Sequence, residues 1–478
     1  MAGPAPFDPA PTLGYLPCCV EGPADWLPKA AYALRMLLLP LGWAPRWVDR
    51  PSLKALGTGI YYGPVAKGWP DGVLALPLHE TTPAYFAAGV PYAAARVRWR
   101  WNGTECWPAL FGHPDGSADD PVASVFFWLA GWQEHTNRAR DEHGRARFAD
   151  SLQARLGIAT QPPVEATRAA LARMLGQRGV PVRPRRWHGR PWALCPTIDI
   201  DYLRKWRPGI LYREFFLYPF RNLSCQSPGA RLKRLLGVTG EMLGRPDPFR
   251  TAFRRIVAQL QPFGTGTFFF KAGATSAHDV GYSLGRTVRR WIEALQAAGM
   301  EVGLHPSYHA ALHLGHLRRE RDRLAALLDR PPLSVRTHYL RWIEPTTPRI
   351  LATVGFRIDS TLGWSDHEGF RRGTCLPFQL FDVAANAPLP LWEMPLAVME
   401  SVLFVRRELG ADEALRATEA LLEACRRYGG VCVALWHNTL WDERDFPGWG
   451  AHFERILQQA SAKGAFIADL QSAIKNWR

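Results

Sequence analysis

The spacing of hydrophobic and polar residues changes part-way along the chain. Near the N-terminus, the short apolar runs GIYYGP (59–64) and GVLALPL (72–78) are bounded by Gly and Pro, a pattern typical of short strands. Residues 119–145 and 164–179 instead have helical patterns. Asp120 can cap the first of these helices, and Pro121 suits its first turn. The pattern therefore predicts a small, mixed α/β unit.

From Pro191 onward, apolar strand-like runs alternate with helical segments such as 288–300 and 309–330. The strand-like runs are PWALCPTIDID (191–201), GTGTFFFKAG (264–273), EVGLH (301–305), LSVRTHYLRW (333–342), FRIDSTLGW (356–364), PLWEMPLAVM (390–399), GVCVALWHN (430–438) and AFIADL (465–470). This alternation predicts a parallel sheet or a barrel.

The proline- and arginine-rich stretch RPRRWHGRP (183–191) separates the two patterns and predicts a linker. We therefore expect an N-terminal α/β domain of unknown role at residues 1–182 and a β/α domain at residues 192–478. A chain of 478 residues has room for two or three domains, each with its own core.

Composition narrows the set of partners. The net charge of +15 comes mainly from arginines that are scattered along the chain, without a nucleic-acid-binding motif, so we expect no nucleic-acid partner. The eight cysteines include no CxxC pair. The start, MAGPAPFDPAPTLGY, lacks the pattern of a secretory signal, and no window reaches the ~18 to 20 apolar residues of a membrane helix. These features predict a cytoplasmic protein with free thiols and indicate no specific protein partner.

Carboxylates lie at the end of the first strand of the β/α domain. Parallel α/β folds place their sites at the carboxyl ends of strands. Asp199 and Asp201 are two residues apart in TIDID, so their side chains face the same side of a strand. Taken alone, such a pair is more often a polar turn than a site.

Four histidines follow the strand that ends at His305. Pro306 can begin a helix, which would place His305 and His309 one turn apart, able to converge on one metal ion. His313 and His316 continue along the same stripe. Each turn advances ~5.4 Å along the helix axis, whereas zinc-bound nitrogens lie ~2.0 to 2.1 Å from the metal, so successive turns cannot all reach it. We therefore expect His305 and His309 to be ligands, and the other two to have packing or surface roles.

Two histidines and one carboxylate form a catalytic zinc set with an open position for water. A metal lowers the pKa of such a water, to ~7 in favourable sites, and a second carboxylate can accept its proton. His437, at the end of the run VCVAL, could protonate a leaving group. Arg336 and Arg341 could bind a carboxylate with two hydrogen bonds.

These motifs together resemble the polysaccharide deacetylases of carbohydrate esterase family 4, the NodB-homology group. That family has an aspartate pair after a Thr, an H-S/T-x-x-H motif, an Arg-x-Pro-Tyr motif and a late Leu-x-x-His-type histidine. The matching stretches of this chain are Thr197–Asp201, His305–His309, Arg336–Tyr339 and Leu435–His437. The resemblance runs from about Pro191 to the C-terminus. The first half is similar to the uncharacterised domain that precedes the catalytic domain in some bacterial members.

The resemblance implies a distorted (β/α) barrel preceded by a smaller α/β domain. It implies one divalent metal ion, foremost Zn²⁺ with Co²⁺, Ni²⁺ or Fe²⁺ as alternatives. The roles that it implies are a base, Asp199; metal ligands, Asp201, His305 and His309; an acid, His437; an orienting group for the base, Arg336; and a backbone contribution to oxyanion stabilisation at Tyr339.

The chain departs from the family pattern at two places: Ile200 separates the aspartates, and His338 replaces the usual proline. Further candidates for contacts around the site or with a substrate are Asp359, Glu393, Arg341, Trp342 and Trp436. For Asp359 and Glu393, a salt bridge or a structural turn fits equally well.

The sequence therefore predicts a metal-dependent hydrolase that removes an N-acetyl or related acyl group from an amino-sugar or glycan-precursor substrate. Two alternatives remain open. One is a metal-dependent amidase acting on a non-sugar or cyclic amide. The other is a carbohydrate-binding protein with a non-catalytic site.

Overall fold

The computed structural model describes residues 14–477, apart from 66, 77, 89–97, 102–105, 112–119, 138, 213–227 and 245. The first 13 residues, on which the interpretation of the N-terminus depends, lie outside the described part. Among the helices that are described, none is both long enough and apolar enough to cross a membrane.

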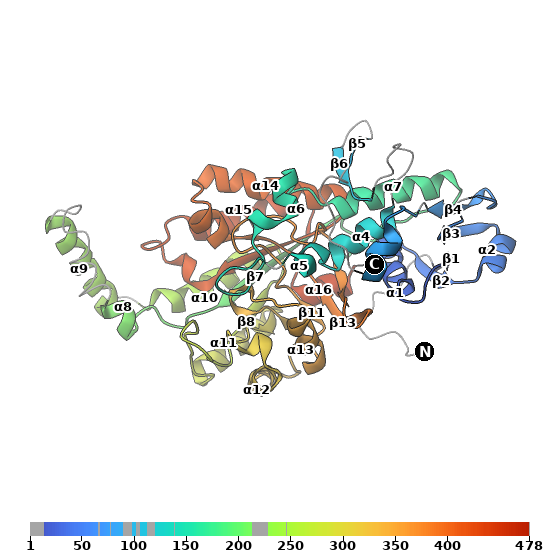
Figure 1. Ribbon diagram of the computed structural model, residues 1–478. Helices are drawn as coiled ribbons and strands as arrows, with labels where there is room; N and C mark the ends of the chain where they lie inside the picture. The colour runs from blue at the N-terminus through green and yellow to red at the C-terminus, as the bar shows by residue number, and fades with distance from the viewer. Residues whose placement is uncertain are drawn as a thin grey trace.

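The N-terminal region contains a four-stranded parallel sheet in the order β2-β1-β3-β4, at one end of the molecule (Figure 1). Its strands are β1 (Tyr15–Val20), β2 (Ala44–Trp47), β3 (Thr58–Tyr62) and β4 (Gly72–Leu76), and a separate hairpin consists of β5 (Arg98–Trp101) and β6 (Cys106–Ala109). The helices are α1 (Leu27–Leu38), α2 (Arg50–Leu56), α3 (Thr82–Ala88), α4 (Pro121–Leu129), α5 (Trp132–Thr136), α6 (Leu152–Leu156) and α7 (Pro163–Gln177). The carboxylate of Asp120 accepts the Ala123 N–H, so the expected cap of α4 is confirmed.

The second region is built on a larger sheet in the order β12-β13-β11-β10-β9-β8-β7-β15-β14, with β16 paired to β7. All pairs are parallel except β12 with β13. The strands are β7 (Ala193–Ile200), β8 (Thr267–Phe270), β9 (Glu301–Leu304), β10 (Ser334–Val335), β11 (Ile358–Asp359), β12 (Phe378–Asp382), β13 (Ala387–Glu393), β14 (Leu396–Met399), β15 (Val431–His437) and β16 (Phe466–Ile467). The helices are α8 (Pro208–Tyr212), α9 (Pro228–Gly244), α10 (Pro248–Leu260), α11 (Arg286–Ala297), α12 (Leu314–Ala325), α13 (Thr346–Val354), α14 (Ala411–Tyr428), α15 (Trp449–Ala462) and α16 (Leu470–Lys475).

This sheet curls into an open, distorted barrel. Arg336 follows β10, which lies three strand spacings from β7, or ~14 Å in a flat sheet. Its Nη1 nevertheless donates hydrogen bonds to Thr197 Oγ1 at 2.6 Å and to Asp199 Oδ1 at 3.2 Å, both on β7. Side chains of non-adjacent strands therefore meet inside the curl. The expected α/β fold with a distorted (β/α) barrel is confirmed.

Three elements differ from the sequence-based expectations. The single helix expected over residues 119–145 is instead two helices, α4 and α5, separated at Gly131, which adopts a left-handed conformation. The segment after Pro306 is a turn followed by a short 3-10 helix at Ala310–Leu312, and α12 begins only at Leu314. The run 390–399 contains two strands, because β13 ends at Glu393 and β14 begins after a two-residue break.

The two regions share one continuous hydrophobic core. The stretch at 183–191, expected to be a linker, packs closely: Trp187 is fully buried, and Arg185 donates to the backbone oxygens of Leu39 and Trp477. Across the contact, Glu134 of α5 forms two hydrogen bonds with the Arg371 guanidinium, at 2.9 and 2.7 Å. Both of these charged side chains are buried.

Candidate metal centre

Strand β7 positions the two aspartates. All eight of its residues are buried, and the parallel pairing with β15 places His437 beside Asp199. Asp199 is the last-but-one residue of the strand, and Asp201 is the first residue beyond it. The Arg336 guanidinium is itself anchored, because it also donates to the carbonyl and hydroxyl oxygens of Ser360. The carboxylate of Asp199 is therefore held by a fixed cation.

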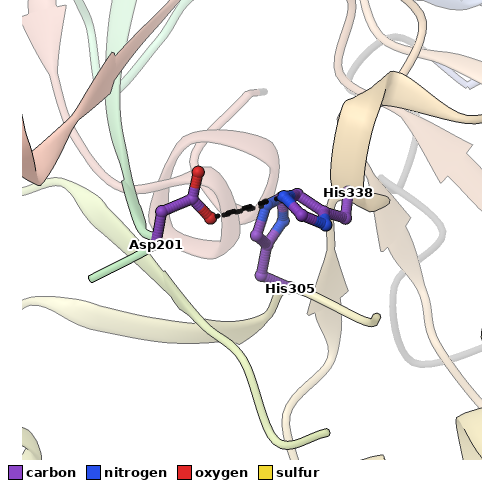
Figure 2. A group of neighbouring side chains, drawn as sticks. All are labelled: Asp201, His305 and His338. Carbon is purple, nitrogen blue, oxygen red and sulfur yellow. Dashed lines mark ion pairs between the residues drawn. The ribbon is translucent and has the colours of Figure 1, made fainter. Parts of the chain in front are cut away.

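Asp201, His305 and His338 form a group whose ligand atoms lie within 4.8 Å of one another (Figure 2). The Nε2 atoms of His305 and His338 lie 3.6 and 3.7 Å from the same oxygen, Asp201 Oδ1. His305 Nδ1 is 2.7 Å from the Arg336 carbonyl oxygen, and His338 Nδ1 is 2.8 Å from a carboxylate oxygen of Asp279. Since both partners are acceptors, each Nδ1 carries the proton and each Nε2 presents a lone pair to Asp201, as in histidines that bind metals.

These residues fit a divalent metal ion. His305 Nε2 is buried and has no hydrogen-bond partner among the described residues, which is costly unless another group satisfies it, and Asp201 Oδ1 has no hydrogen bond there but faces Lys271 Nζ in an ion pair at 3.2 Å. Burial lowers the pKa of His305 to about 4 despite the nearby aspartates, so its imidazole is neutral at pH 7. Burial raises the pKa of Asp201, but Lys271 and three histidines outweigh it and hold the pKa well below its usual range. A neutral imidazole and an ionised carboxylate are the forms that bind metals.

A buried lysine also faces this group. Lys271 follows β8, and its Nζ lies 3.2 Å from Asp201 Oδ1. The sequence interpretation did not include it, although a polar residue directly after the run TFFF is a signal of the same kind as Asp201 after β7. Lys271 offers a fixed positive charge at the oxygen that a metal would use.

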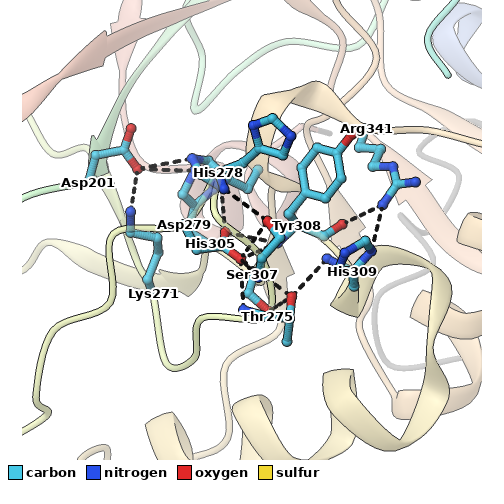
Figure 3. Close-up of polar contacts among 12 residues, drawn as sticks. Asp201, Lys271, Thr275, His278, Asp279, His305, Ser307, Tyr308, His309 and Arg341 are labelled. Carbon is cyan, nitrogen blue, oxygen red and sulfur yellow. Dashed lines mark hydrogen bonds and ion pairs between the residues drawn. The ribbon is translucent and has the colours of Figure 1, made fainter. Parts of the chain in front are cut away.

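His309 lies outside the metal group, contrary to the sequence-based expectation. The chain from Pro306 to His309 is not helical, so the predicted one-turn spacing from His305 does not exist. The imidazole contacts the Arg341 guanidinium at 3.4 Å, on the far side of Ser307 and Tyr308 from Asp201 (Figure 3). With His313 and His316, His309 lines a separate pocket of about 470 Å³. His338 takes the place that sequence reasoning gave to His309.

His437 ends β15, which pairs with β7 on the side opposite to β8. Its Nε2 lies 3.7 Å from Asp201 Oδ2, and its Nδ1 lies 2.5 Å from Glu400 Oε1, directly after β14. Burial lowers the pKa of His437, but Glu400 and then the two aspartates outweigh it and raise the pKa to about 10. At neutral pH the ring is therefore the positively charged imidazolium, with a proton on both nitrogens. Glu400 was not predicted, although it too directly follows an apolar strand.

The loop at Tyr339 forms part of the site wall. Tyr339 has a φ of 62°, in the left-handed region, where a non-glycine residue is strained. The N-terminal region holds this loop: Arg145 Nη1 donates to the Tyr339 carbonyl at 2.7 Å, and His143 Nδ1 lies 3.1 Å from the Tyr308 hydroxyl. The His143 and Tyr339 ring centres are 4.6 Å apart. Residues from the first region thus contribute to the surroundings of the metal group.

The carboxyl groups of Asp359 and Glu393 are fully buried and act on each other electrostatically. Burial first, and then the charge of Asp359, raise the pKa of Glu393 well above its usual range. The Leu362 N–H and the Thr361 hydroxyl complete this network. Its role is to hold the chain beyond β11 and β13 in place.

The remaining candidates from the sequence lie apart from the metal group. Arg341 donates to the Tyr308 carbonyl and stacks over its ring, with its guanidinium carbon 4.2 Å from the ring centre. Trp342 and Trp436 are buried. Trp436 Nε1 donates to the Trp449 carbonyl oxygen, so this indole packs against α15 behind the sheet. Neither indole belongs to the metal group.

Comparison with known proteins gives a family of unknown function (DUF7033) for residues 79–180, within the N-terminal region. No curated protein sequence matches the chain. Solved structures similar to it include a protein assigned to the polysaccharide deacetylases, from Mycobacterium smegmatis, with 20% identity and a TM-score of 0.40, covering 61% of this chain and 91% of that one.

Two further similar structures belong to carbohydrate esterase family 4. One is a pseudoenzyme from Bacillus anthracis, with 10% identity and a TM-score of 0.32, covering 61% of this chain and 68% of that one. The other is an esterase from Streptomyces lividans in complex with acetate, with 12% identity and a TM-score of 0.29, covering 58% and 92%. These proteins carry the family name that the motifs indicate. Because they are distant, we base function on the side chains of this chain.

Proposed function

We propose that the protein is a metal-dependent hydrolase that removes an N-acetyl or related acyl group from an amino-sugar substrate. The observation that carries this proposal is the convergence of Asp201, His305 and His338, with the buried His305 Nε2 left without a hydrogen-bond partner among the described residues. A divalent ion, foremost zinc, would be held by these three residues and would polarise the amide carbonyl and lower the pKa of a water.

The chain's own residues supply the proton transfers. Asp199 accepts the proton of the attacking water, and Arg336 holds its carboxylate in one orientation. His437, kept protonated by Glu400, donates a proton to the amide nitrogen as its bond to the acyl carbon breaks. Water and the amide are thereby converted into a carboxylic acid and a free amine. The base and the acid come from neighbouring strands, one on each side of Asp201.

One observation favours the alternative of a binding protein without catalysis. The Lys271 ammonium lies at the Asp201 oxygen that a metal requires, and a permanent Lys–Asp pair would prevent metal binding. Metal content and turnover distinguish the two functions.

The test is acetate release by the zinc-loaded full chain from N-acetylglucosamine oligomers, UDP-N-acetylglucosamine and simple non-sugar N-acetyl amides. The matched variant is Asp199→Asn, which preserves shape but cannot accept a proton. It should retain zinc and lose ~10²- to 10⁴-fold in kcat. Equal rates in the wild type and in Asp199→Asn would show that Asp199 is not the base. Turnover of non-sugar amides alone would mean that the substrate is not a sugar. Zinc binding without any turnover would support the non-catalytic alternative.

A further inference from the structure

A second pocket, of about 390 Å³, adjoins the metal group. Its lining includes Tyr202, the residue after Asp201, and Tyr282. The Tyr282 hydroxyl donates to the Ile200 carbonyl at 2.8 Å and accepts the Lys271 N–H at 2.7 Å. The wall of this pocket is thus fixed to the two strand ends that carry Asp201 and Lys271.

Four arginines line this pocket, and no carboxylate is among its described lining residues. They are Arg204, Arg207, Arg250 and Arg286. The guanidinium carbon of Arg207 lies 4.0 Å from the centre of the Tyr202 ring, which holds it in place. Its buried Nε has no hydrogen-bond partner within the described part of the chain. A preorganised guanidinium with an unsatisfied donor indicates an anionic ligand.

Two carboxylates close in sequence to the pocket residues are already engaged. Asp201 pairs with Lys271. Asp247 accepts the backbone N–H groups of Lys205, Trp206 and Phe249.

One of the arginines occupies a helix position that normally disfavours cations. Arg286 is the first residue of α11, whose N-cap, Gly285, provides no side-chain hydrogen bond and whose first turn contains no acidic residue. Arg250 is the third residue of α10, where the carboxylate of the N-cap, Asp247, already supplies a negative charge. The positive end of a helix dipole repels a cation, so an anion bound beside Arg286 would offset this cost and would also accept N–H groups of α11.

We propose that this pocket binds a diphosphate group of the substrate, so that the amino sugar processed at Asp201 is a sugar diphosphate ester, nucleotide-linked or lipid-linked. The inference rests on the proposed function for the sugar, whereas anion binding by the pocket stands independently of it. Arginine guanidinium groups match phosphate oxygens with paired hydrogen bonds, and several together accommodate the two phosphates.

The first experiment measures pyrophosphate binding to the zinc-loaded full chain by isothermal titration calorimetry. Arg207→Gln and Arg250→Gln should each weaken binding ~10-fold or more, since a hydrogen bond to a charged group contributes ~1.5 to 3 kcal/mol. The matched control is Arg289→Gln on α11, which changes net charge equally but lies outside the pocket lining and should leave affinity within about twofold. Circular dichroism confirms that each variant is folded. Affinity unchanged in the pocket variants but lost in His305→Ala would place the anion on the metal and overturn the proposal.

The second experiment compares kcat/KM for UDP-N-acetylglucosamine, farnesyl-diphospho-N-acetylglucosamine and neutral chitotriose. One of the two diphosphates should be preferred at least ~10-fold over chitotriose, with the preference lost through KM in Arg207→Gln. The better of the two identifies the nucleotide or lipid source. Equal kcat/KM values of the wild type for chitotriose and for both diphosphates, with all three unchanged in Arg207→Gln, would overturn the inference and leave the proposed function intact. Arginine-dependent pyrophosphate binding with no turnover of any sugar would overturn the proposed function and leave anion binding by the pocket intact.

Discussion

The imidazole of His437 and the carboxylate of Glu400 are joined by a hydrogen bond of 2.5 Å between Nδ1 and Oε1. Glu400 is buried, with its other oxygen lacking a hydrogen-bond partner in the described structure. Nearly all of its charge therefore acts on the imidazole, and this pair determines the pH range over which His437 can donate a proton.

Glu400→Gln should narrow the pH range of activity. Glu400 raises the pKa of His437, and the acid is active only while protonated, so the alkaline loss of activity begins at lower pH once this charge is removed. The measurement is kcat/KM for amide hydrolysis between pH 5 and pH 10 for both proteins. An alkaline limb that does not move, with only a uniform loss of rate, would show that Glu400 positions the ring without tuning it.

Metal content should depend on His338 and not on His309. Zinc measured by mass spectrometry after dialysis should be lost in His338→Ala and retained in His309→Ala. Asp279→Asn should weaken zinc affinity ~10- to 100-fold, because Asp279 orients the His338 ring. Zinc lost in His309→Ala and kept in His338→Ala would restore the assignment expected from the sequence.

Lys271→Met should tighten zinc binding. The ammonium competes with a metal for Asp201 Oδ1, and removing this ion-pair partner changes zinc affinity by about an order of magnitude. Competition with a fluorescent zinc chelator measures the effect. A weaker affinity in this variant would mean that Lys271 instead orients Asp201 for the metal.

Glu134→Gln should destabilise the fold by ~3 to 5 kcal/mol, because it leaves Arg371 buried without its counter-charge, while Arg372 keeps its ion pair with Glu344. Burial raises the pKa of Glu134, but the two arginines outweigh it and lower the pKa from 4.5 to about 2. A lowered folded-state pKa contributes stability that is fully present above pH 4.5 and is lost as the pH falls towards 2. Urea unfolding at pH 6 and pH 3 measures both effects.

The matched control for this prediction is Glu423→Gln, which breaks the half-exposed pair with Arg426 on α14. This variant should unfold almost as the wild type does, because exposed ion pairs contribute little. A loss of stability in Glu134→Gln no larger than in this control would mean that water reaches the contact between the two regions.

Local patterns in the sequence predicted much of the fold but only part of the site. The β/α alternation, the strand ends at Asp199 and His437 and the cap at Asp120 all follow from short-range periodicity, and the structure contains each of them. The assignment of His309 failed because it assumed that Pro306 begins a helix, whereas the chain turns at this point and α12 starts at Leu314. Only the tertiary curl of the sheet brings His338, which follows β10, to within 3.7 Å of Asp201 beyond β7.

Lys271, Glu400 and Asp279 were missed for a related reason. Each contacts a partner distant in sequence, such as Lys271 with Asp201 or Glu400 with His437. Periodicity carries no information about which strand ends become neighbours. Lys271 and Glu400 each come directly after a strand in the structure. A comparison of all polar residues that directly follow a strand would therefore have identified both as candidates for the site.

The shared core and the Glu134–Arg371 pair make the two regions interdependent halves of a single folding unit. A gene fragment encoding residues 192–478 alone would translate into a barrel with an uncovered apolar flank and with Arg371 lacking its counter-charge, so it should aggregate. Residues 1–191 supplied as a second polypeptide should restore that surface by complementation in trans. The chain is therefore suited to a split-protein assay, in which recovery of soluble, zinc-binding protein reports reassembly, and His143 and Arg145 bring the N-terminal fragment within reach of the metal-site loop.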